Sequence, residues 1–434
     1  MSRFVIEGGH PLHGTFRPMG NKNAALPMLA ACVLTDQPVH LHNVPRILDV
    51  ENLLALLADL GVDVSRDGHA VTLCAAALRK TDLDPDLCRR VRGSILLAGP
   101  LAARHGTATL YPPGGDVIGR RRLDTHFAGL AALGIAMTRR GDAFRLRRAA
   151  VPPRAAAPEI LLDEASVTAT ENILMAAVLV PGTHVILNAA CEPHVQDLAA
   201  LLVAMGASID GIGTNRLVVT GVPALHGATR RIGPDYIEIG SLLAAAAATR
   251  GTVTVTDAPH PLPSIPALVV ARLLDRLGVA LASRPDALHL PPVQSLRVRP
   301  DLGGSIPKIE DGIWPAIPSD LLSVAIVLAT QARGDILFFE KLFESRMYFV
   351  DRLLEMGARV VACDPHRVLV SGPSRLRAKH MTSPDIRAGM ALIIAALAAD
   401  GTSIIDNADM VDRGYEAIDA RLRRLGAHIV REPS

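Results

Sequence analysis

The sequence has few aromatic residues, few cysteines and almost no net charge. Each shortage limits the kind of core, compartment or partner that the protein can have. Only 3% of the 434 residues are aromatic, so the core has to be built from Ala, Leu, Val and Ile, which suits packed helices and buried strands. The 5 cysteines are scattered and lack paired metal-ligand spacing, which is typical of a reducing compartment. A formal net charge of +2 with dispersed Arg residues argues against a nucleic-acid partner.

Long hydrophobic runs are also missing. The longest apolar stretch, residues 389–399, is shorter than the roughly 20 residues that cross a bilayer. The N-terminal sequence MSRFVIEGGH has no basic segment followed by an apolar run and a small-residue cleavage site. We therefore expect a cytoplasmic protein without a membrane span. The chain is longer than one hydrophobic core usually supports, which favours two domains.

A Leu-Gly or Met-Gly step ends a helical pattern and begins a strand six times along the chain. The steps fall at Gly61, Gly134, Gly206, Gly278, Gly357 and Gly426. Each is preceded by an apolar helix, a turn, a short strand, a connection and an amphipathic helix. The repetition predicts an α/β fold of six units, most simply two domains of three. A solenoid that only binds partners is the alternative.

The first helix of each unit is apolar nearly all round, as in residues 241–249 and 321–332, which predicts burial on every side. A buried helix has to satisfy its free N-terminal N–H groups with polar side chains or a bound anion. Polar residues are found at these first turns: Lys22, Asn23, Arg92, Ser166, Thr168, Glu238, Asp320, Asp385 and Arg387. If the helix N-termini of two domains face each other, the cleft between them should bind a multiply anionic ligand.

A series of short motifs resembles the UDP-N-acetylglucosamine enolpyruvyl transferase family in order and spacing, over essentially the whole chain. The motifs are residues 20–27 (GNKNAALP), 92–95, 113–115, 166–172, 318–320, 343–346, 385–388 and 412–416. Each one is weakly specific, whereas the ordered set is highly specific. The resemblance implies a two-domain inside-out α/β barrel with six repeated α/β units, three per domain.

The resemblance also implies domain boundaries. Residues 1–20 plus 232–434 would form a discontinuous domain, and residues 21–231 would form the other domain, which carries the catalytic loop 112–122. The chain would cross between domains near Lys22 and Arg231, and these crossings would act as a hinge for ligand-driven closure.

The reaction of the family transfers the enolpyruvyl group of phosphoenolpyruvate, a co-substrate, to a hydroxyl of a uridine nucleotide through a tetrahedral intermediate. Addition of the hydroxyl to C2 needs a proton at C3, a base at the hydroxyl and a cationic pocket for carboxylate and phosphate. Neither a metal nor a cofactor is required. By resemblance the catalytic residues are Lys22, Asn23, Asp116, Asp320 and Arg413.

The resemblance assigns two groups of binding residues. Phosphoenolpyruvate would contact Lys22, Arg121, Arg346, Asp385, Arg387 and Arg413, with Arg346 and Arg387 holding its carboxylate. The nucleotide would contact Arg92, Arg121, Arg122, Leu123, Asp124, Thr125, Ser166, Val167, Thr168, Asp320 and Leu342. Asn23 would bind the tetrahedral species. Asp320 would accept or orient the proton of the hydroxyl, although Asp320 and Asp385 could also serve as helix N-caps.

Asp116 departs from many members of the family, which have Cys after the Gly-Gly pair of this loop. A carboxylic acid can still deliver the proton to C3 if burial raises its pKa. It cannot form the thioether by which fosfomycin disables Cys-bearing members, so we expect insensitivity to fosfomycin. The alternative is that Asp116 only belongs to a mobile Gly-rich loop.

Other departures concern the acceptor. Arg122 and Thr125 stand where Pro and Leu are usual, residues 313–317 replace an aromatic-Pro-Gly-Phe run, and His194 and Tyr236 replace charged residues. The leading acceptor is the 3-hydroxyl of UDP-N-acetylglucosamine, as in peptidoglycan synthesis. The alternatives are UMP, as in nucleoside-antibiotic biosynthesis, 3-phosphoshikimate, and a catalytically silent nucleotide-binding paralogue.

Overall fold

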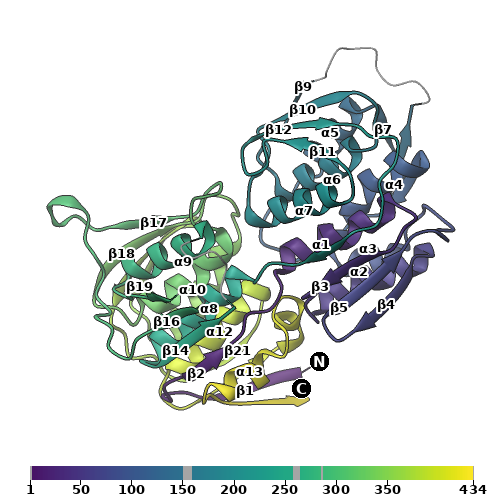
Figure 1. Ribbon diagram of the computed structural model, residues 1–434. Coiled ribbons are helices and arrows are strands. Elements are labelled where there is room, and N and C mark those ends of the chain that lie inside the picture. Colours follow the sequence, from purple (N-terminus) through teal and green to yellow (C-terminus); the bar gives the residue numbers. More distant parts are fainter. Residues whose placement is uncertain (1, 150–158, 258–263, 285–286, 434) are drawn as a thin grey trace. The chain divides into compact units, whose positions relative to one another are not determined.

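The computed structural model describes residues 2–149, 159–257, 264–284 and 287–433 (Figure 1). The chain divides into two compact units. Unit 1 comprises Met1–Met19, Asp116–Arg120 and Pro234–Ser434, and unit 2 comprises Gly20–Gly115 and Arg121–Gly233. No helix within the described ranges combines the length and apolarity that a bilayer crossing requires.

The described residues of unit 1 form three four-stranded sheets. In strand order they are β21 (His380–Thr382), β22 (Thr402–Asp406), β1 (Ser2–Glu7) and β23 (His428–Pro433); β15 (Ala282–Arg284), β16 (Ala287–Leu290), β14 (Thr252–Thr256) and β2 (His13–Phe16); and β17 (Lys308–Glu310), β18 (Gly334–Phe339), β20 (Arg367–Gly372) and β19 (Val360–Asp364). Each sheet has one parallel pair at an edge and two antiparallel pairs.

Unit 2 repeats this arrangement. Its sheets are β13 (Thr229–Arg231), β3 (Val39–His42), β5 (Ala70–Cys74) and β4 (Asp63–Asp67); β11 (Ser208–Asp210), β12 (Arg216–Thr220), β10 (Thr183–Leu187) and β9 (Glu159–Leu161); and β6 (Thr107–Leu110), β8 (Ala143–Arg148) and β7 (Ile135–Arg140). The four-stranded sheets again have an edge parallel pair. In the three-stranded sheet, a parallel bridge between Asp82 and Thr109 takes that place.

The helices of both units form an inner and an outer set. The inner helices are α8 (Tyr236–Ala248), α10 (Ser319–Ala329) and α12 (Ile386–Ala398) in unit 1, and α1 (Lys22–Ala30), α4 (Ala98–His105) and α6 (Val167–Ala177) in unit 2. The outer helices are α9 (Ile265–Arg276), α11 (Val350–Glu355) and α13 (Ile418–Arg424), and α2 (Leu48–Leu60), α3 (Pro85–Arg90), α5 (Asp124–Ala132) and α7 (Pro193–Ala204). Short 3₁₀ segments are η1 (Ala31–Leu34), η2 (Arg92–Leu97), η3 (Leu302–Gly304), η4 (Arg346–Phe349) and η5 (Ala408–Arg413).

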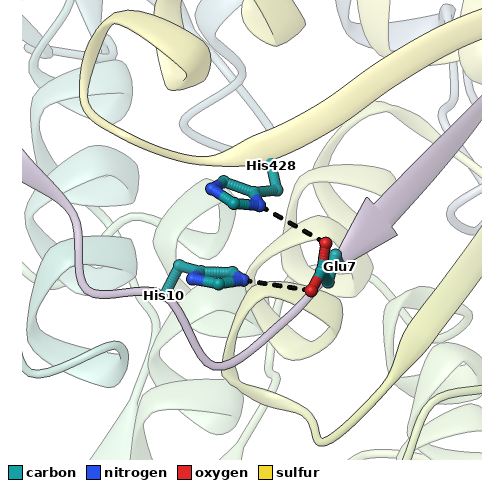
Figure 2. A group of neighbouring side chains, drawn as sticks. All are labelled: Glu7, His10 and His428. Carbon is teal, nitrogen blue, oxygen red and sulfur yellow. Dashed lines mark hydrogen bonds and ion pairs between the residues drawn. The ribbon is translucent and has the colours of Figure 1, made fainter.

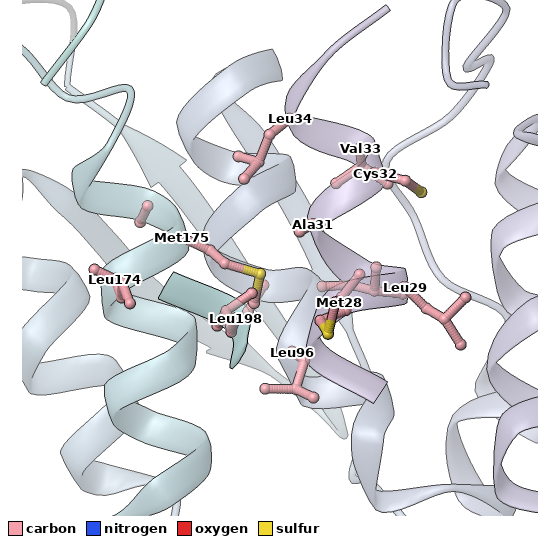
Figure 3. Close-up of a cluster of buried hydrophobic side chains, with 14 of the residues drawn as sticks. Met28, Leu29, Ala31, Cys32, Val33, Leu34, Leu96, Leu174, Met175 and Leu198 are labelled. Carbon is pink, nitrogen blue, oxygen red and sulfur yellow. The ribbon is translucent and has the colours of Figure 1, made fainter. Parts of the chain in front are cut away.

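The inner helices are as buried as their sequences predict, and every residue of α8 is buried. Close packing depends on glycine at two crossings. A Cβ at Gly240 of α8 would lie 2.7 Å from Leu321 of α10, and one at Gly99 of α4 would lie 2.3 Å from the carbonyl oxygen of Asn172 in α6. Figure 3 shows part of the aliphatic core of unit 2, where Met28 faces the helices that carry Met175 and Leu198.

Two predicted helix boundaries are wrong. Residues 92–97 form the 3₁₀ segment η2 instead of the first α-helical turn, and α4 begins only at Ala98. Pro100 has no amide hydrogen for the carbonyl of Leu96, which prevents an earlier α-helical ladder. The amphipathic pattern of residues 415–425 predicts a helix that starts at Tyr415, whereas α13 begins at Ile418, because Ala417 has a left-handed conformation with φ 42° and follows η5.

Candidate functional site

In unit 1, Asp320 lies between two buried guanidinium groups. Its Oδ1 accepts a hydrogen bond from Nη2 of Arg346 at 3.1 Å, and its Oδ2 accepts from Nη2 of Arg387 at 2.7 Å and from Nε at 2.9 Å. The side chains of both arginines are 5% exposed, whereas that of Asp320 is 24% exposed. The carboxylate therefore lies on the solvent side of the pair.

Helix starts position these three side chains. Asp385 caps α12, since its Oδ1 accepts hydrogen bonds from the backbone N–H groups of Arg387 and Ala388 at 2.8 and 2.9 Å. Arg387 is thereby fixed in the first turn of α12, while Asp320 is in the first turn of α10. The N-cap position of α10 is Pro318, so Asp320 is not a helix cap. Its side chain instead accepts hydrogen bonds from Arg346 and Arg387.

The two arginines keep unused hydrogen-bonding capacity. Nη1 of Arg346 and Nη1 of Arg387 are buried and have no hydrogen-bond partner among the described residues. Burial disfavours the charge of Arg387, but Asp320 and Tyr415 more than offset this effect and hold its pKa above the ordinary value. Both guanidinium groups also stack on aromatic rings, Arg346 on Phe343 and Arg387 on Tyr415. Fixed, buried donors of this kind suit an anionic ligand.

Behind Arg346 is a buried carboxyl group that was not predicted from the sequence. Glu340 accepts hydrogen bonds from Ser319 Oγ at 2.8 Å and from the backbone N–H of Phe343 at 3.1 Å, and its Oε2 lies 3.9 Å from Nε of Arg346. Burial, reinforced by the neighbouring Asp311, raises the pKa of Glu340 to about 8. Glu340 thus connects α10, the turn after β18 and η4.

The raised pKa of Glu340 makes stability depend on pH. In the unfolded chain this group loses its proton near its ordinary pKa of 4.5, whereas in the folded chain it keeps the proton up to about pH 8. The contribution of Glu340 to the free energy of unfolding is therefore fully present below about pH 4.5. It is lost as the pH rises from there through about 8. We expect Glu340→Gln to reduce this fall, as measured by thermal unfolding at pH 5.5, 7 and 8.5. Glu355→Gln, an exposed pair with Arg352, is the control, and equal declines in all three proteins would contradict the assignment.

Asp116 and Arg413 form a second charged group in unit 1. Oδ1 of Asp116 lies 2.6 Å from Nη1 of Arg413, with 13% and 14% of the two side chains exposed. Burial raises the pKa of Asp385, an effect that Arg346 opposes and Asp116 reinforces. The two charged groups of unit 1 therefore act on each other electrostatically.

The tip of the predicted catalytic loop belongs to unit 1. The family resemblance assigned all of residues 112–122 to the domain that corresponds to unit 2, whereas Asp116–Arg120 group with unit 1. The carbonyl of Ile118 accepts a hydrogen bond from Ser345 N–H at 3.1 Å, and the Arg120 N–H donates to Glu344 at 2.8 Å. Together with the Asp116–Arg413 ion pair, these contacts hold the tip.

In unit 2, Lys22 forms an ion pair with Asp49, with 2.7 Å between Nζ and Oδ2. Their side chains are 11% and 3% exposed. Asn21 caps α1 through the N–H of Ala24 and starts the helix at Lys22, so that Asn23 follows half-buried in the first turn. The predicted polar start of this inner helix is present.

Arg92 and Arg121 approach each other beside the loop. Nη2 of Arg92 donates to the carbonyl of Arg121 at 2.7 Å, and a Cβ at Gly115 would lie 3.0 Å from Arg92 and 3.4 Å from Nη1 of Arg121. Burial lowers the pKa of Arg92 to about 10, and the charge of Arg121 adds to this effect. Two like charges held together in a partly buried place favour an anion as ligand.

The remaining predicted nucleotide-binding residues of unit 2 gather at the starts of α5 and α6. Leu123 and Asp124 begin α5, Arg122 pairs with Asp124 at 3.4 Å, and Ser166 caps α6. Val167 and Thr168 are half-buried in the first turn of α6. Thr125 donates to Glu164 at 3.4 Å. Two neighbouring helix N-termini form a place that is suited to phosphate, because the first turn of a helix presents N–H groups that have no partner within the helix.

His126 joins these helix starts, although it was not among the predicted site residues. Its Nε2 lies 3.1 Å from Oγ1 of Thr168, and its Nδ1 lies 3.1 Å from Nδ2 of Asn172. Burial, together with the charge of Arg92, lowers the pKa of His126 to about 3, so that the ring is neutral. His126 lies three residues after Leu123 within a helical pattern. From the sequence alone, this position indicates only a residue of the helix core and does not indicate a site residue.

The predicted residues thus form separate groups within each unit. Unit 1 holds Asp116, Asp320, Leu342, Arg346, Asp385, Arg387 and Arg413. Unit 2 holds Lys22, Asn23, Arg92, Arg121, Arg122, Leu123, Asp124, Thr125, Ser166, Val167 and Thr168. Leu342 differs from the others of unit 1, since it is apolar and 44% exposed, and its backbone N–H donates to Asp311.

Buried guanidinium pairs and helix N-termini on this repeated fold define a protein that handles small anionic molecules. Residues 6–422 match the family described as EPSP synthase (3-phosphoshikimate 1-carboxyvinyltransferase). The fold is similar to that of the enolpyruvyl transferase NikO from Streptomyces tendae, with a TM-score of 0.87 and 23% identity over 100% of this chain and 99% of that one. EPSP synthase from Acinetobacter baumannii gives a TM-score of 0.74 at 15% identity, with both chains fully covered. The chain belongs to the carboxyvinyl (enolpyruvyl) transferase family and is an enzyme.

Curated relatives give a closer placement within that family. The chain is 52% identical over 433 residues to UDP-N-acetylglucosamine 1-carboxyvinyltransferase of Bradyrhizobium diazoefficiens, covering 99% of this chain and 98% of the relative. The enzyme of the same name from Treponema pallidum is 51% identical, with both chains fully covered. The family resemblance read from the motifs is confirmed.

Proposed function

We propose that this enzyme transfers the enolpyruvyl group of phosphoenolpyruvate to the 3-hydroxyl of UDP-N-acetylglucosamine and releases phosphate. The observation that carries the proposal is the pair of buried arginines, Arg346 and Arg387, on either side of Asp320. The Nη1 atoms of both arginines have no hydrogen-bond partner among the described residues. The names of its full-length relatives support the choice of acceptor. The product would serve peptidoglycan synthesis.

The groups of unit 1 have the chemistry for the phosphoenolpyruvate half of the reaction. Arg346 and Arg387 would donate to the carboxylate, and Arg413 would bind the phosphate. As the O–C2 bond forms, Asp320 takes the hydroxyl proton and Asp116 gives a proton to C3. Asp116 then takes a proton back from C3 while the C2–O bond to phosphate breaks, and the phosphate leaves with the bonding electron pair and the proton that Asp320 had taken, which restores the double bond. An incoming phosphate would compete with Asp116 for Arg413, which frees the carboxyl group to carry the proton.

The groups of unit 2 have the chemistry for the nucleotide and for the charged intermediate. The N-termini of α5 and α6, with Arg92 and Arg121 nearby, would bind the uridine diphosphate. Lys22 would contact the phosphate that leaves, and Asn23 the tetrahedral species. We propose that both sets of residues serve one reaction without a metal or cofactor, in the cytosol.

We also propose the finer description of the fold that the family implies. Three α/β units per domain, each built from an inner helix, an outer helix and a small sheet, would form an inside-out α/β barrel. Its domains would be residues 1–20 plus 232–434, and residues 21–231. The edge parallel pair that recurs in the sheets supports the repeat.

Phosphate release tests the acceptor. The full-length protein is incubated with phosphoenolpyruvate and UDP-N-acetylglucosamine, UMP or 3-phosphoshikimate, and the enolpyruvyl product is identified by mass spectrometry. Turnover with UDP-N-acetylglucosamine at a kcat/KM well above the others supports the proposal. Release with UMP alone would select a nucleoside-antibiotic role, and no release with any acceptor would indicate a silent nucleotide-binding protein.

Fosfomycin tests the role of Asp116. We expect the native enzyme to keep full activity after prolonged exposure to the drug, because a carboxylate does not form the stable thioether that disables Cys-bearing members. The matched variant Asp116→Cys should become inactivated over time, since Arg413, 2.6 Å from Asp116, would stabilise a thiolate there. Cys363→Ser, at the exposed native cysteine, controls for other thiols. Time-dependent covalent labelling of Asp116 would contradict the prediction.

A further inference from the structure

Two histidines and a glutamate meet at one end of the sheet formed by β21, β22, β1 and β23. Glu7 ends β1 and lies directly opposite His428, the first residue of β23, in the antiparallel register. His10 follows three residues after Glu7. Figure 2 shows both imidazole rings on the same side, each with one nitrogen directed at the Glu7 carboxylate. Residues from the two ends of the chain are thereby brought together.

The backbone that carries these side chains is held firmly. Gly8 N–H donates to the carbonyl of Gly401 at 3.1 Å, and Gly9 N–H donates to that of Leu397 at 2.9 Å. A Cβ at Gly8 would lie 2.1 Å from the carbonyl oxygen of Ala399, so only glycine permits this approach. The turn between Glu7 and His10 is therefore fixed before any ligand binds, as a preorganised site requires.

The ligand atoms have a separation that suits a metal ion. Nε2 of His10 lies 3.4 Å from Oε1 of Glu7, and Nδ1 of His428 lies 3.3 Å from Oε2. With bonds of about 2.1 Å, the edge of a tetrahedral zinc site is about 3.4 Å. The rings are stacked with centroids 3.8 Å apart and planes 18° apart, and the candidate ligand atoms of all three residues lie within 4.8 Å of one another. Small side-chain rotations can direct all three at one ion.

The local field and the ligand types also favour a cation. The C-terminal end of α12 contacts Gly8 and Gly9, and this end of a helix carries partial negative charge. Imidazole nitrogens with one carboxylate suit zinc, copper and nickel better than calcium or magnesium. Glu7 and His428 are exposed and His10 is half-buried, which leaves room for water as a fourth ligand.

We propose that Glu7, His10 and His428 form a zinc-binding site that fastens the N-terminal strand β1 to the C-terminal strand β23. The site is separate from the proposed chemistry, because Arg387 is at the opposite end of α12, about 16 Å away along the helix axis. No metal was expected from the sequence, and the proposed ion takes no part in the transfer reaction. Its effect is on stability, since an ion that binds only the folded chain shifts unfolding by mass action.

The test is Zn²⁺ binding by the full-length protein in a Cys363→Ser background, which removes the exposed thiol. Isothermal titration at pH 7.5 should give one Zn²⁺ per chain, and saturation should raise the unfolding temperature. Glu7→Gln, His10→Ala and His428→Ala should each weaken binding at least about tenfold and reduce the thermal shift at the same Zn²⁺ concentration. Turnover without Zn²⁺ should be unchanged, which also shows that the variants fold. Co²⁺ in place of Zn²⁺ should give visible d–d absorption that His428→Ala removes.

His380→Ala is the matched control, because His380 pairs with Asp406 at 2.6 Å on the same sheet but has no second histidine in the pair. It should bind Zn²⁺ as the background protein does. Unchanged Zn²⁺ affinity in both His10→Ala and His428→Ala would overturn the proposal. A thermal shift that follows pH but not Zn²⁺ would also overturn it and would identify a group that binds only protons.

Discussion

Asp320→Asn is expected to lower kcat by at least about a hundredfold while leaving KM for phosphoenolpyruvate unchanged or lower. Asn cannot accept the hydroxyl proton, and loss of a positioned base costs about 10²- to 10⁴-fold. Its amide oxygen can still accept hydrogen bonds from Arg346 or Arg387, so the geometry persists. The variant lacks the Asp320 carboxylate, which competes with phosphoenolpyruvate for the two arginines. The carboxylate of phosphoenolpyruvate should therefore bind at least as tightly as in the native enzyme. Steady-state kinetics with both substrates varied measures the split.

Asp301→Asn is the control for this variant. Asp301 forms an ion pair of 2.7 Å with Arg276 in the same unit, so it reports what the loss of an Asp–Arg pair alone does. It should change neither kinetic constant. Turnover of Asp320→Asn within a few-fold of the native enzyme would refute the role as base. A KM that rises in parallel with the fall in kcat would instead indicate that Asp320 only positions the arginines.

The helical part of the fold could be read from the sequence because its signals are local. Runs such as residues 241–249 are apolar on every side, and α8 is buried at every residue. The Leu-Gly steps also marked helix ends, as at Gly61, which has φ 96° and ends α2. Where prediction failed, a single residue decided the boundary: Pro100 delayed α4, and left-handed Ala417 delayed α13.

The charged residues of the candidate site were readable for a different reason. Arg346 and Arg387 belong to motifs whose order resembles the family, and the structure brings both to Asp320. Glu340 was missed because it lies outside those motifs. A single Glu after the strand pattern of β18 is typical of an exposed strand end. Only the folded chain shows that Ser319 donates a hydrogen bond to Glu340 and that Asp311 lies close enough to raise its pKa.

His126 and the Glu7 cluster show the same limit at longer range. His126 forms hydrogen bonds with Thr168 and Asn172, which are 42 and 46 residues away, and no spacing rule connects them. Glu7 and His428 are 421 residues apart and meet only because β1 and β23 pair in one register. A shift of that register by one residue would turn the two side chains to opposite faces, so the pairing exists only at the level of the sheet.

Arg413→Ala is expected to lower kcat/KM for phosphoenolpyruvate by at least about a hundredfold, or about 2.7 kcal/mol of transition-state stabilisation. Arg413 is the partner of Asp116 at 2.6 Å, and its side chain is only 14% exposed. The variant therefore loses a cation for the phosphate and also the group that positions the proposed acid. Arg413→Lys keeps the positive charge but lacks the paired N–H donors of the guanidinium group. It should recover part of the lost kcat/KM.

Arg431→Ala separates this effect from the loss of an ion pair nearby. Arg431 forms two hydrogen bonds of 2.7 Å with Asp412, the residue next to Arg413. Its loss should lower the unfolding temperature but leave kcat/KM within a few-fold, because Arg431 belongs to the pairing of η5 with β23 and has no proposed contact with substrate. If Arg431→Ala lowers kcat/KM as much as Arg413→Ala does, the segment 412–416 acts through stability alone. In that case the phosphate contact of Arg413, and with it the assignment of Asp116 as the acid beside it, would have to be abandoned.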